Sequence, residues 1–285
     1  AKYWDYYFFN NEGEVADPLK TTAQNISQGT AAITPIHYAY YQKALGNITD
    51  EELQSQLASL KKNNYAKDYA DAVYKQRVMQ QYNLSLRGRS DKFTNNLTLN
   101  YKYDNSGLIN HFANQFNAQY KGSYNVAKWL TASMTINGIY SKSKEAGYDY
   151  NSSYTSIWRQ PAYMPFYNAD GSVKGQHYWY DGNDYLTFDS PFEDLSSNPV
   201  DEYYKNTQTT RRQYMRYHGD LLFKIIDGLT AKAQFVYETN HKTVEWNATQ
   251  DSHVMRTMRN AYYYQAADGT IKNYVPTTGG MLRTT

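Results

Sequence analysis

The sequence contains no cysteine, which excludes disulfides, thiolate metal sites and a thiol nucleophile. It also contains no run of about 18 apolar residues, so we expect no transmembrane helix. The first residues, Ala1 to Trp4, lack the features of a signal peptide, and we expect either that one was removed or that the chain begins inside a longer protein. The net charge of +2, without a Lys/Arg cluster, does not favour binding to nucleic acid.

Catalytic motifs are missing as well. The six histidines form no i, i+4 pair and no HExxH motif, and the sequence has no P-loop, dinucleotide fingerprint or GxSxG. The adjacent acids Glu193-Asp194 and Asp201-Glu202 could serve as glycosidase carboxylates, but adjacent acids in a loop are more often solvated surface. Residues 181–184 match part of a calcium loop without the spacing or distant Glu of an EF-hand. We therefore expect neither an enzyme nor a cofactor.

The sequence is instead rich in alternating segments and in tyrosine, with 32 residues of that type. Four segments between Val78 and Ser141 alternate apolar and polar residues strictly, which predicts strands with one apolar and one polar face. Each reaches about ten residues or more, the length that a tilted strand needs to cross a bilayer, whereas globular strands average about 5–6. The apolar members include the following residues: Tyr82, Leu84, Leu86, Leu97, Leu99, Tyr101, Phe116, Ala118, Tyr120, Leu130, Met134, Ile136 and Tyr140.

The composition of the two faces favours a membrane barrel. The polar positions are mostly Asn, Gln, Ser and Thr, as in a water-filled lumen, and the apolar positions are Tyr, Phe and Leu, as in a lipid-facing wall with aromatic girdles. A soluble β-sandwich or a long amphipathic sheet is the alternative.

The connections between strands are sorted by length. Two later strands are expected at about 212–225 and 229–239, which makes six in all. Short turns are expected at 88–91, 127–129 and 226–228, and Asp227-Gly228 is a strong hairpin signal. Long connections are expected at 103–112, at 142–210 and after Thr239. Short turns at one end and long loops at the other are typical of outer-membrane barrels.

We therefore predict an all-β fold: a segment of an antiparallel transmembrane β-barrel with long, partly helical extracellular loops. The expected parts are a partly helical extracellular connection (1–77), four barrel strands (78–144), a long aromatic extracellular loop (145–205), a barrel hairpin (206–245), and an extracellular loop with the start of the next strands (246–285).

Helices are expected mainly in the first part. Thr49 and Glu52 fit a capping box, which predicts a helix with Leu53, Leu57 and Leu60 on one face. Other helical segments are expected near 4–8, 66–75 and 254–258, and 11–36 is expected to be a loop. Asp268-Gly269 predicts a small hairpin, and the ending 279–285 shows neither a closing strand nor a terminal aromatic.

The aromatic loop holds the candidate binding residues. Exposed rings among Asp and Asn suit sugars or peptides, because ring faces stack on apolar ligand faces while polar neighbours form hydrogen bonds. The alternative is that these rings pack the loop onto itself. The candidates are Trp158, Tyr163, Tyr178, Trp179, Tyr180 and Tyr185.

The segment 80–92, QQYNLSLRGRSDK, resembles the SusC/RagA family of TonB-linked outer-membrane transporters, in which a similar motif precedes an alternating strand. Residues 97–109 resemble the family's second element and 125–130, NVAKWL, its third. The likeness is good over about 60–145, and Arg87-Gly88-Arg89 departs from the Ser-Gly-Gly that the family favours, which changes a turn rather than a site.

This resemblance implies a 22-stranded barrel in the bacterial outer membrane, with an N-terminal plug and TonB-driven import of a nutrient, for which an oligosaccharide is favoured over an oligopeptide. It also implies a SusD-like lipoprotein partner, contact with outer-membrane lipid, and pairs of the two proteins that could dimerise. The chain has too few strands for such a barrel and no plug, so we expect an internal piece of a longer transporter. The alternative function is a soluble all-β carbohydrate-binding module of a secreted protein.

Overall fold

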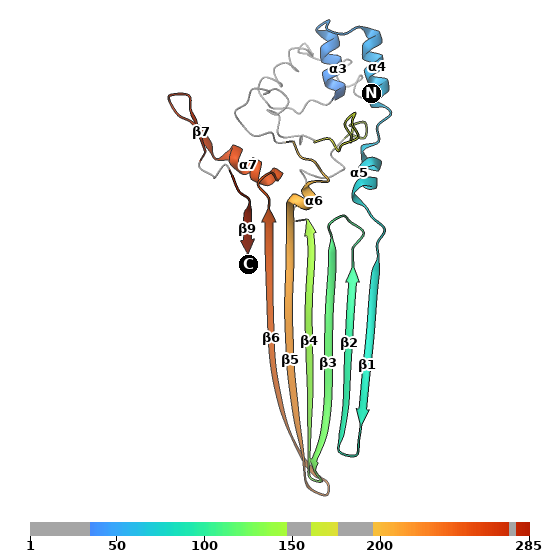
Figure 1. Ribbon diagram of the computed structural model, residues 1–285, viewed down its shortest axis with the longest axis vertical. Coiled ribbons are helices and arrows are strands. Elements are labelled where there is room, and N and C mark those ends of the chain that lie inside the picture. Colours follow the sequence, from blue (N-terminus) through green and yellow to red (C-terminus); the bar gives the residue numbers. More distant parts are fainter. Residues whose placement is uncertain (1–34, 147–160, 176–195, 274–277) are drawn as a thin grey trace, which may run out of the picture. The chain divides into compact units, whose positions relative to one another are not determined.

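A computed structural model describes residues 35–146, 161–175, 196–273 and 278–285 (Figure 1). The chain divides into two compact units. The helical unit comprises residues 1–73, 148–206 and 248–281, and the sheet unit comprises residues 74–147, 207–247 and 282–285.

The sheet unit is an antiparallel sheet of seven strands in the order β1-β2-β3-β4-β5-β6-β9 (Figure 1). Up to β6, strands that follow one another in the chain are also neighbours in the sheet. The strands are β1 (Met79–Arg89), β2 (Phe93–Asp104), β3 (Phe112–Ala127), β4 (Leu130–Ala146), β5 (Asn206–Ile226), β6 (Leu229–Ala248) and β9 (Met281–Thr284). The predicted all-β fold and its six long strands are confirmed, and the sheet is not closed.

The sequence predicts the start of further strands within 246–285 but does not locate the last strand, and it predicts no closing strand over 279–285. Met281–Thr284 forms β9 beside β6, and the backbones of Val244 and Thr285 exchange hydrogen bonds of 2.7 and 2.9 Å. A strand of four residues is too short to show an alternating pattern in the sequence, so it is recognised only by its pairing with β6.

Register is nearly unbroken from β1 to β5. Pairing of β1 with β2 runs from Met79↔Asp104 to Arg89↔Thr94, and the β3–β4 pairing shifts register between Asn125 and Ala127. A slip of one residue would move a strand's side chains to the other face of the sheet. Continuous register therefore keeps each row of side chains on one face across five strands.

Turn chemistry explains the tight ends of the strands. At the β1–β2 turn, the Ser90 amide donates to the carbonyl of Phe93 at 2.8 Å, and the Phe93 amide donates to the Ser90 hydroxyl at 3.3 Å. At the β5–β6 turn, Gly228 has a φ of 82°, which glycine adopts without strain. The β2–β3 connection at the opposite end is longer, as predicted from its sequence.

The helical unit contains α3 (Pro35–Ala44), α4 (Asp50–Leu60) and α5 (Tyr65–Val73). The predicted capping box is present: the Thr49 hydroxyl accepts from the Glu52 amide at 3.2 Å, and the Thr49 amide donates to Glu52 Oε2 at 2.8 Å. The buried residues Ile36, Ala39, Leu53 and Leu57 form a core between α3 and α4. The predicted helix at 66–75 is confirmed as α5, whereas α3 was not predicted. None of the described helices is long and apolar enough to cross a membrane.

Aromatic packing continues this unit beyond the helices. Phe166 is 1% exposed and makes edge contacts with Tyr65 and Tyr69, with ring centroids 5.4 and 6.3 Å apart. The Tyr69 and Tyr203 hydroxyls are 3.1 Å apart and form a buried hydrogen bond. Part of the region predicted as an aromatic loop therefore packs against α5.

Two further helices meet at a buried carboxylate. Glu202, the first residue of α6 (Glu202–Lys205), is 2% exposed, and its Oε1 accepts from the His253 amide at 2.8 Å. His253 begins α7 (His253–Ala261), so the Glu202 carboxyl group lies at the N-terminus of that helix. Glu202 Oε2 has no hydrogen-bond partner among the described residues. The expectation that Glu202 lies on a solvated surface is wrong, because a helix from a distant segment covers it.

A small hairpin completes the described part of this unit. Strands β7 (Tyr263–Gln265) and β8 (Ile271–Asn273) pair antiparallel, and Gly269 lies in the turn with a φ of 83°. This confirms the turn predicted at Asp268-Gly269. The helix predicted near 254–258 is confirmed as α7.

Burial raises the pKa of Glu202 above its ordinary value of 4.5, more than the His253 amide lowers it. The folded state therefore binds this proton more tightly than the unfolded state. The stability contributed by this group is complete below the ordinary pKa and is lost as pH rises through the raised pKa. Glu202→Gln keeps an acceptor for the His253 amide and removes the titration.

We predict that this substitution flattens the decline in α7 hydrogen-exchange protection as pH rises above about 4.5. Glu51→Gln, at an exposed acid of α4, is the control. Equal pH slopes in Glu202→Gln and the unmodified protein would contradict the prediction.

Candidate functional site

The register assigns the side chains of β1–β5 to two faces. Directly paired residues point to the same side of the sheet, and successive residues point to opposite sides. Leu84, Leu99, Ala118, Gly138 and Met215 form one row across the five strands. The residues next to them form a row on the other side: Asn83, Asn100, Asn117, Ile139 and Tyr214. We call these sides the apolar face and the polar face.

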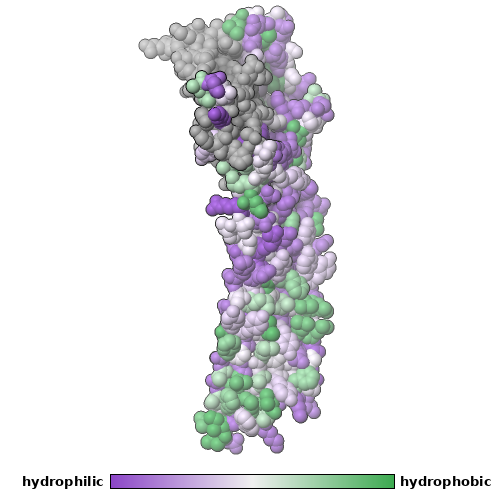
Figure 2. Space-filling model, turned by 60° about the vertical axis from the view of Figure 1, so that its left-hand side comes forward, coloured by the Kyte–Doolittle hydropathy of each residue, from purple (hydrophilic) through white to green (hydrophobic). Residues whose placement is uncertain are grey.

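The apolar face is a band with aromatic rings at both limits. Its limit toward the long connections is the row Tyr82, Tyr101, Phe116 and Tyr140. Its limit toward the hairpin turns includes Phe93, Tyr124, Trp129 and Phe223, and the rings of Trp129 and Phe223 stack with centroids 6.3 Å apart. In Figure 2, green residues gather over the hairpin end of the strands and purple residues over the opposite end.

The height of this band follows from strand geometry. Along β4 it extends from Leu130 to Tyr140, about ten residues, or about 34 Å at about 3.4 Å per residue. A strand tilt of about 35–45° would reduce this to about 25 Å across the layer, which is the height of the apolar band on membrane barrels.

The described parts of the chain leave this face open. Tyr82, Leu84 and Leu86 remain 61%, 51% and 54% exposed, and Phe235 and Tyr237 of β6 remain 66% and 54% exposed. Soluble monomers rarely expose contiguous apolar patches larger than a few hundred Å². An apolar solvent or a covering protein layer is therefore required.

The polar face carries a ladder of amide side chains. Asn100 Nδ2 donates to Asn83 Oδ1, and Asn117 Nδ2 donates to Asn100 Oδ1 at 2.9 Å. Gln119 Nε2 donates to Asn137 Oδ1 at 2.7 Å on the neighbouring pair of strands. Amides offer donors and acceptors without net charge, so such a wall can contact hydrated solutes of either sign.

Several charged groups on the polar face of β5 and β6 form ion pairs. The Asp220 carboxylate receives a hydrogen bond of 2.7 Å from Gln234 and forms an ion pair of 3.0 Å with Lys232. Arg216 forms an ion pair of 3.1 Å with Glu238. No group of three or more potential metal ligands occurs among the residues that the structure describes.

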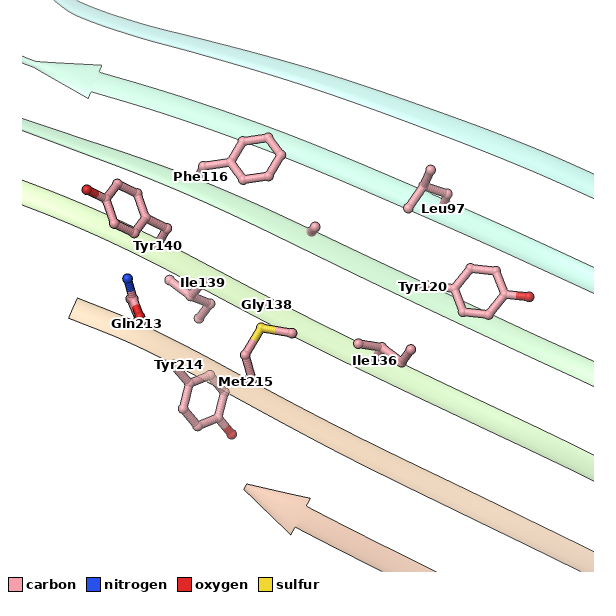
Figure 3. A pocket seen from close by; sticks show the side chains of 11 residues that line it. Leu97, Phe116, Tyr120, Ile136, Gly138, Ile139, Tyr140, Gln213, Tyr214 and Met215 are labelled. Carbon is pink, nitrogen blue, oxygen red and sulfur yellow. The ribbon is translucent and has the colours of Figure 1, made fainter. Parts of the chain in front are cut away.

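The apolar face contains a shallow groove of about 400 Å³ (Figure 3). Ala118 and Gly138 form its floor because they are the smallest residues of their row. Phe116, Tyr120, Ile136 and Tyr140 line it, with Met215 from β5. A Cβ at Gly138 would lie 3.0 Å from the Met215 sulfur, so glycine at this position leaves room for the Met215 side chain.

One polar group on the apolar face is satisfied within the sheet. The Tyr120 hydroxyl donates to Asn95 Oδ1 at 2.7 Å. The ring passes over Gly122, where a Cβ would lie 2.6 Å from the Tyr120 hydroxyl oxygen. Glycine at 122 therefore leaves room for the Tyr120 ring, whose hydroxyl donates the hydrogen bond to Asn95 Oδ1.

Of the binding residues predicted from the sequence, Tyr163 is described. It packs, partly buried, against the core between α3 and α4, and its carbonyl accepts from Asn63 Nδ2 at 2.9 Å. This position fits the alternative in which the aromatic rings pack the protein. Trp158, Tyr178, Trp179, Tyr180 and Tyr185 lie outside the described residues, so their role in binding stays a prediction.

The groove and the amide ladder were not predicted from the sequence. The signal for the groove was present, since Ala118 and Gly138 interrupt otherwise large residues at apolar positions. Their alignment depends on the β3–β4 register, which the pattern of either strand alone does not determine.

No family model and no curated protein matches the sequence. Solved structures are similar in fold. The structure of the RagAB peptide transporter has a TM-score of 0.50 and 15% identity, and the match covers 65% of this chain and 20% of that chain. Structures of the RagAB peptide importer in the 'open-open' and 'closed-closed' states have TM-scores of 0.49, identities of 15% and 16%, and matches covering 64% of this chain and 19% and 20% of theirs.

The chain thus spans about a fifth of the length of the solved chains that it matches. At this identity the likeness shows a shared fold, and it agrees at that level with the resemblance of residues 80–130 to the SusC/RagA family.

We predict that Gly122→Ala lowers the free energy of unfolding by about 1–3 kcal/mol, because it displaces the Tyr120 ring and leaves the Asn95 amide unpaired. Tyr120→Phe should have a similar effect by removing the donor alone. Gly88→Ala lies in the same row with no atom within 4 Å of the added Cβ and is the matched control. Urea titration measures all three, and equal losses in Gly122→Ala and Gly88→Ala would contradict the prediction.

Proposed function

We propose that this chain forms part of the wall of an outer-membrane β-barrel that imports a nutrient. The observation that carries the proposal is the band on the apolar face, with its aromatic limits and a height of about 25 Å at the usual tilt. Hydrocarbon covers such a band without a second protein layer. The fold likeness to the RagAB peptide transporter supports this assignment.

In this proposal the polar face borders the aqueous lumen. The amide ladder from Asn83 to Asn117 then contacts the passing solute through neutral donors and acceptors. Because these groups carry no charge, they bind the solute only weakly. Both edges of the sheet, β1 and the part of β6 beyond β9, present backbone groups that need partners. Further strands of the transporter would pair with them and close the barrel.

The finer assignment rests on the resemblance to the SusC/RagA family. It adds TonB as the energy-coupling partner, acting through a plug, and a SusD-like lipoprotein on the extracellular side. Because the similar solved structure is that of a peptide transporter, an oligopeptide is the first substrate to test. An oligosaccharide is the second, favoured by the aromatic residues of the 145–205 region, since rings stack well on sugar faces.

The orientation of the two faces is testable with a pair of neighbouring residues. Leu99 and Asn100 are adjacent on β2 and point to opposite faces. The sequence has no cysteine, so Leu99→Cys and Asn100→Cys each create a single site in it for a nitroxide label. In lipid vesicles, we predict that the label at 99 collides mainly with oxygen, which concentrates in hydrocarbon, and the label at 100 with a water-soluble nickel chelate.

Electron paramagnetic resonance power saturation measures both accessibilities. Equal access of the nickel chelate to the two labels would refute the barrel assignment and favour the alternative, a soluble carbohydrate-binding module.

The role of the aromatic region is tested separately. We predict that Trp158→Ala combined with Trp179→Ala lowers uptake of a labelled oligopeptide or oligosaccharide several-fold in cells, because two stacking surfaces are lost. Trp129→Phe, which keeps a ring at the hairpin end of the band, is the control. Unchanged uptake at equal surface amounts of protein would reject a contact role for these residues.

A further inference from the structure

The groove on the apolar face leads to a row of cationic side chains. Tyr140 and its partner Gln213 end the groove toward the long connections (Figure 3). The next residues on the same face are Lys142 and its direct partner Arg211, about 7 Å farther along the strands. Lys144 follows on this face after one more step of two residues.

These cations are only partly neutralised. Arg211 forms an ion pair of 2.9 Å with Glu245. Neither Lys142 nor Lys144 forms an ion pair with any described carboxylate. Like charges directly opposite each other on neighbouring strands destabilise the pairing of the two strands. An anion between Lys142 and Arg211 would remove this repulsion.

The opposite limit of the band has a different character. Beyond Leu221 and Phe223, the next residue of β5 on the apolar face is Ile225, which is 58% exposed. The cationic row therefore marks the end of the band that carries the long connections. In a barrel of the proposed kind, long loops are extracellular and short turns periplasmic.

We infer that the groove and the row of Lys142, Lys144 and Arg211 bind one lipopolysaccharide molecule of the outer leaflet, with a phosphate group on the cations and an acyl chain over Ala118 and Gly138. This inference rests on the proposed function, because it needs the apolar face to contact lipid. The chemistry of the site requires an anionic head directly next to a chain. Lipopolysaccharide has more than one phosphate close to its acyl chains, which suits cations at two successive positions along the strands, Lys142 with Arg211 and then Lys144.

The charge arm of the test uses the purified full-length protein in detergent, titrated with lipopolysaccharide and followed by native mass spectrometry. Lys142→Gln combined with Lys144→Gln should weaken binding roughly 10- to 30-fold, since each cation near an anionic lipid contributes about 1 kcal/mol. Lys102→Gln combined with Lys121→Gln removes the same charge from the polar face and should change binding less than twofold.

The groove arm uses Ala118→Phe, which fills the floor and should weaken binding several-fold. Leu86→Phe, on the apolar face outside the groove, is its control. Phosphatidylglycerol, an anionic lipid with one phosphate, is titrated in parallel. Equal effects of the two lysine pairs, no effect of Ala118→Phe, or equal affinity for phosphatidylglycerol would each overturn the inference.

The nitroxide labels at 99 and 100 separate this failure from a failure of the proposed function. If the label at 99 is accessible to lipid and lipopolysaccharide binding is insensitive to Lys142 and Lys144, the lipid site is wrong and the barrel wall stands. If the label at 99 is accessible to water, both the lipid site and the barrel wall are wrong.

Discussion

Continuous backbone pairing from β1 to β5 gives this sheet its two faces. The pairing aligns alternating strands so that rows such as Leu84, Leu99 and Ala118 share one face, and rows such as Asn83, Asn100 and Asn117 share the other. One slipped strand would place amides among leucines at every second residue. The two-faced sheet is thus a property of the register as much as of the composition.

The solvent that each face of the sheet requires follows from the free-energy cost of exposing apolar side chains to water and polar groups to lipid. The side chains of the amide ladder donate hydrogen bonds to one another and are compatible with water. On the apolar face, the Tyr120 hydroxyl donates to Asn95 Oδ1, and many of the rings and aliphatic chains, such as Tyr82, Leu84 and Phe235, remain exposed in the described chain. Lipid on one side and water on the other remove both costs at once, because each face then meets a solvent of its own polarity.

Local sequence signals predicted the parts of the fold that depend on local chemistry. Alternation between Val78 and Ser141 predicted the first four strands, Asp227-Gly228 the later hairpin, and Thr49 with Glu52 the start of α4. Features that depend on distant partners were missed or wrong. Burial of Glu202 requires α7, 51 residues away, β9 exists only through its pairing with β6, and α3 has no acidic residue in its first turn to mark its start.

The central claim is that hydrocarbon covers the apolar face of β1–β5. Photo-cross-linking in vesicles that contain a phospholipid with a photoactivatable acyl chain tests it over the whole sheet, with adducts located by peptide mass spectrometry. We expect adducts at alternate residues of each strand, between the row of Tyr82 and the row of Leu130, and none on the amide ladder. Adducts distributed equally over both faces, or absent from the sheet, would contradict the claim.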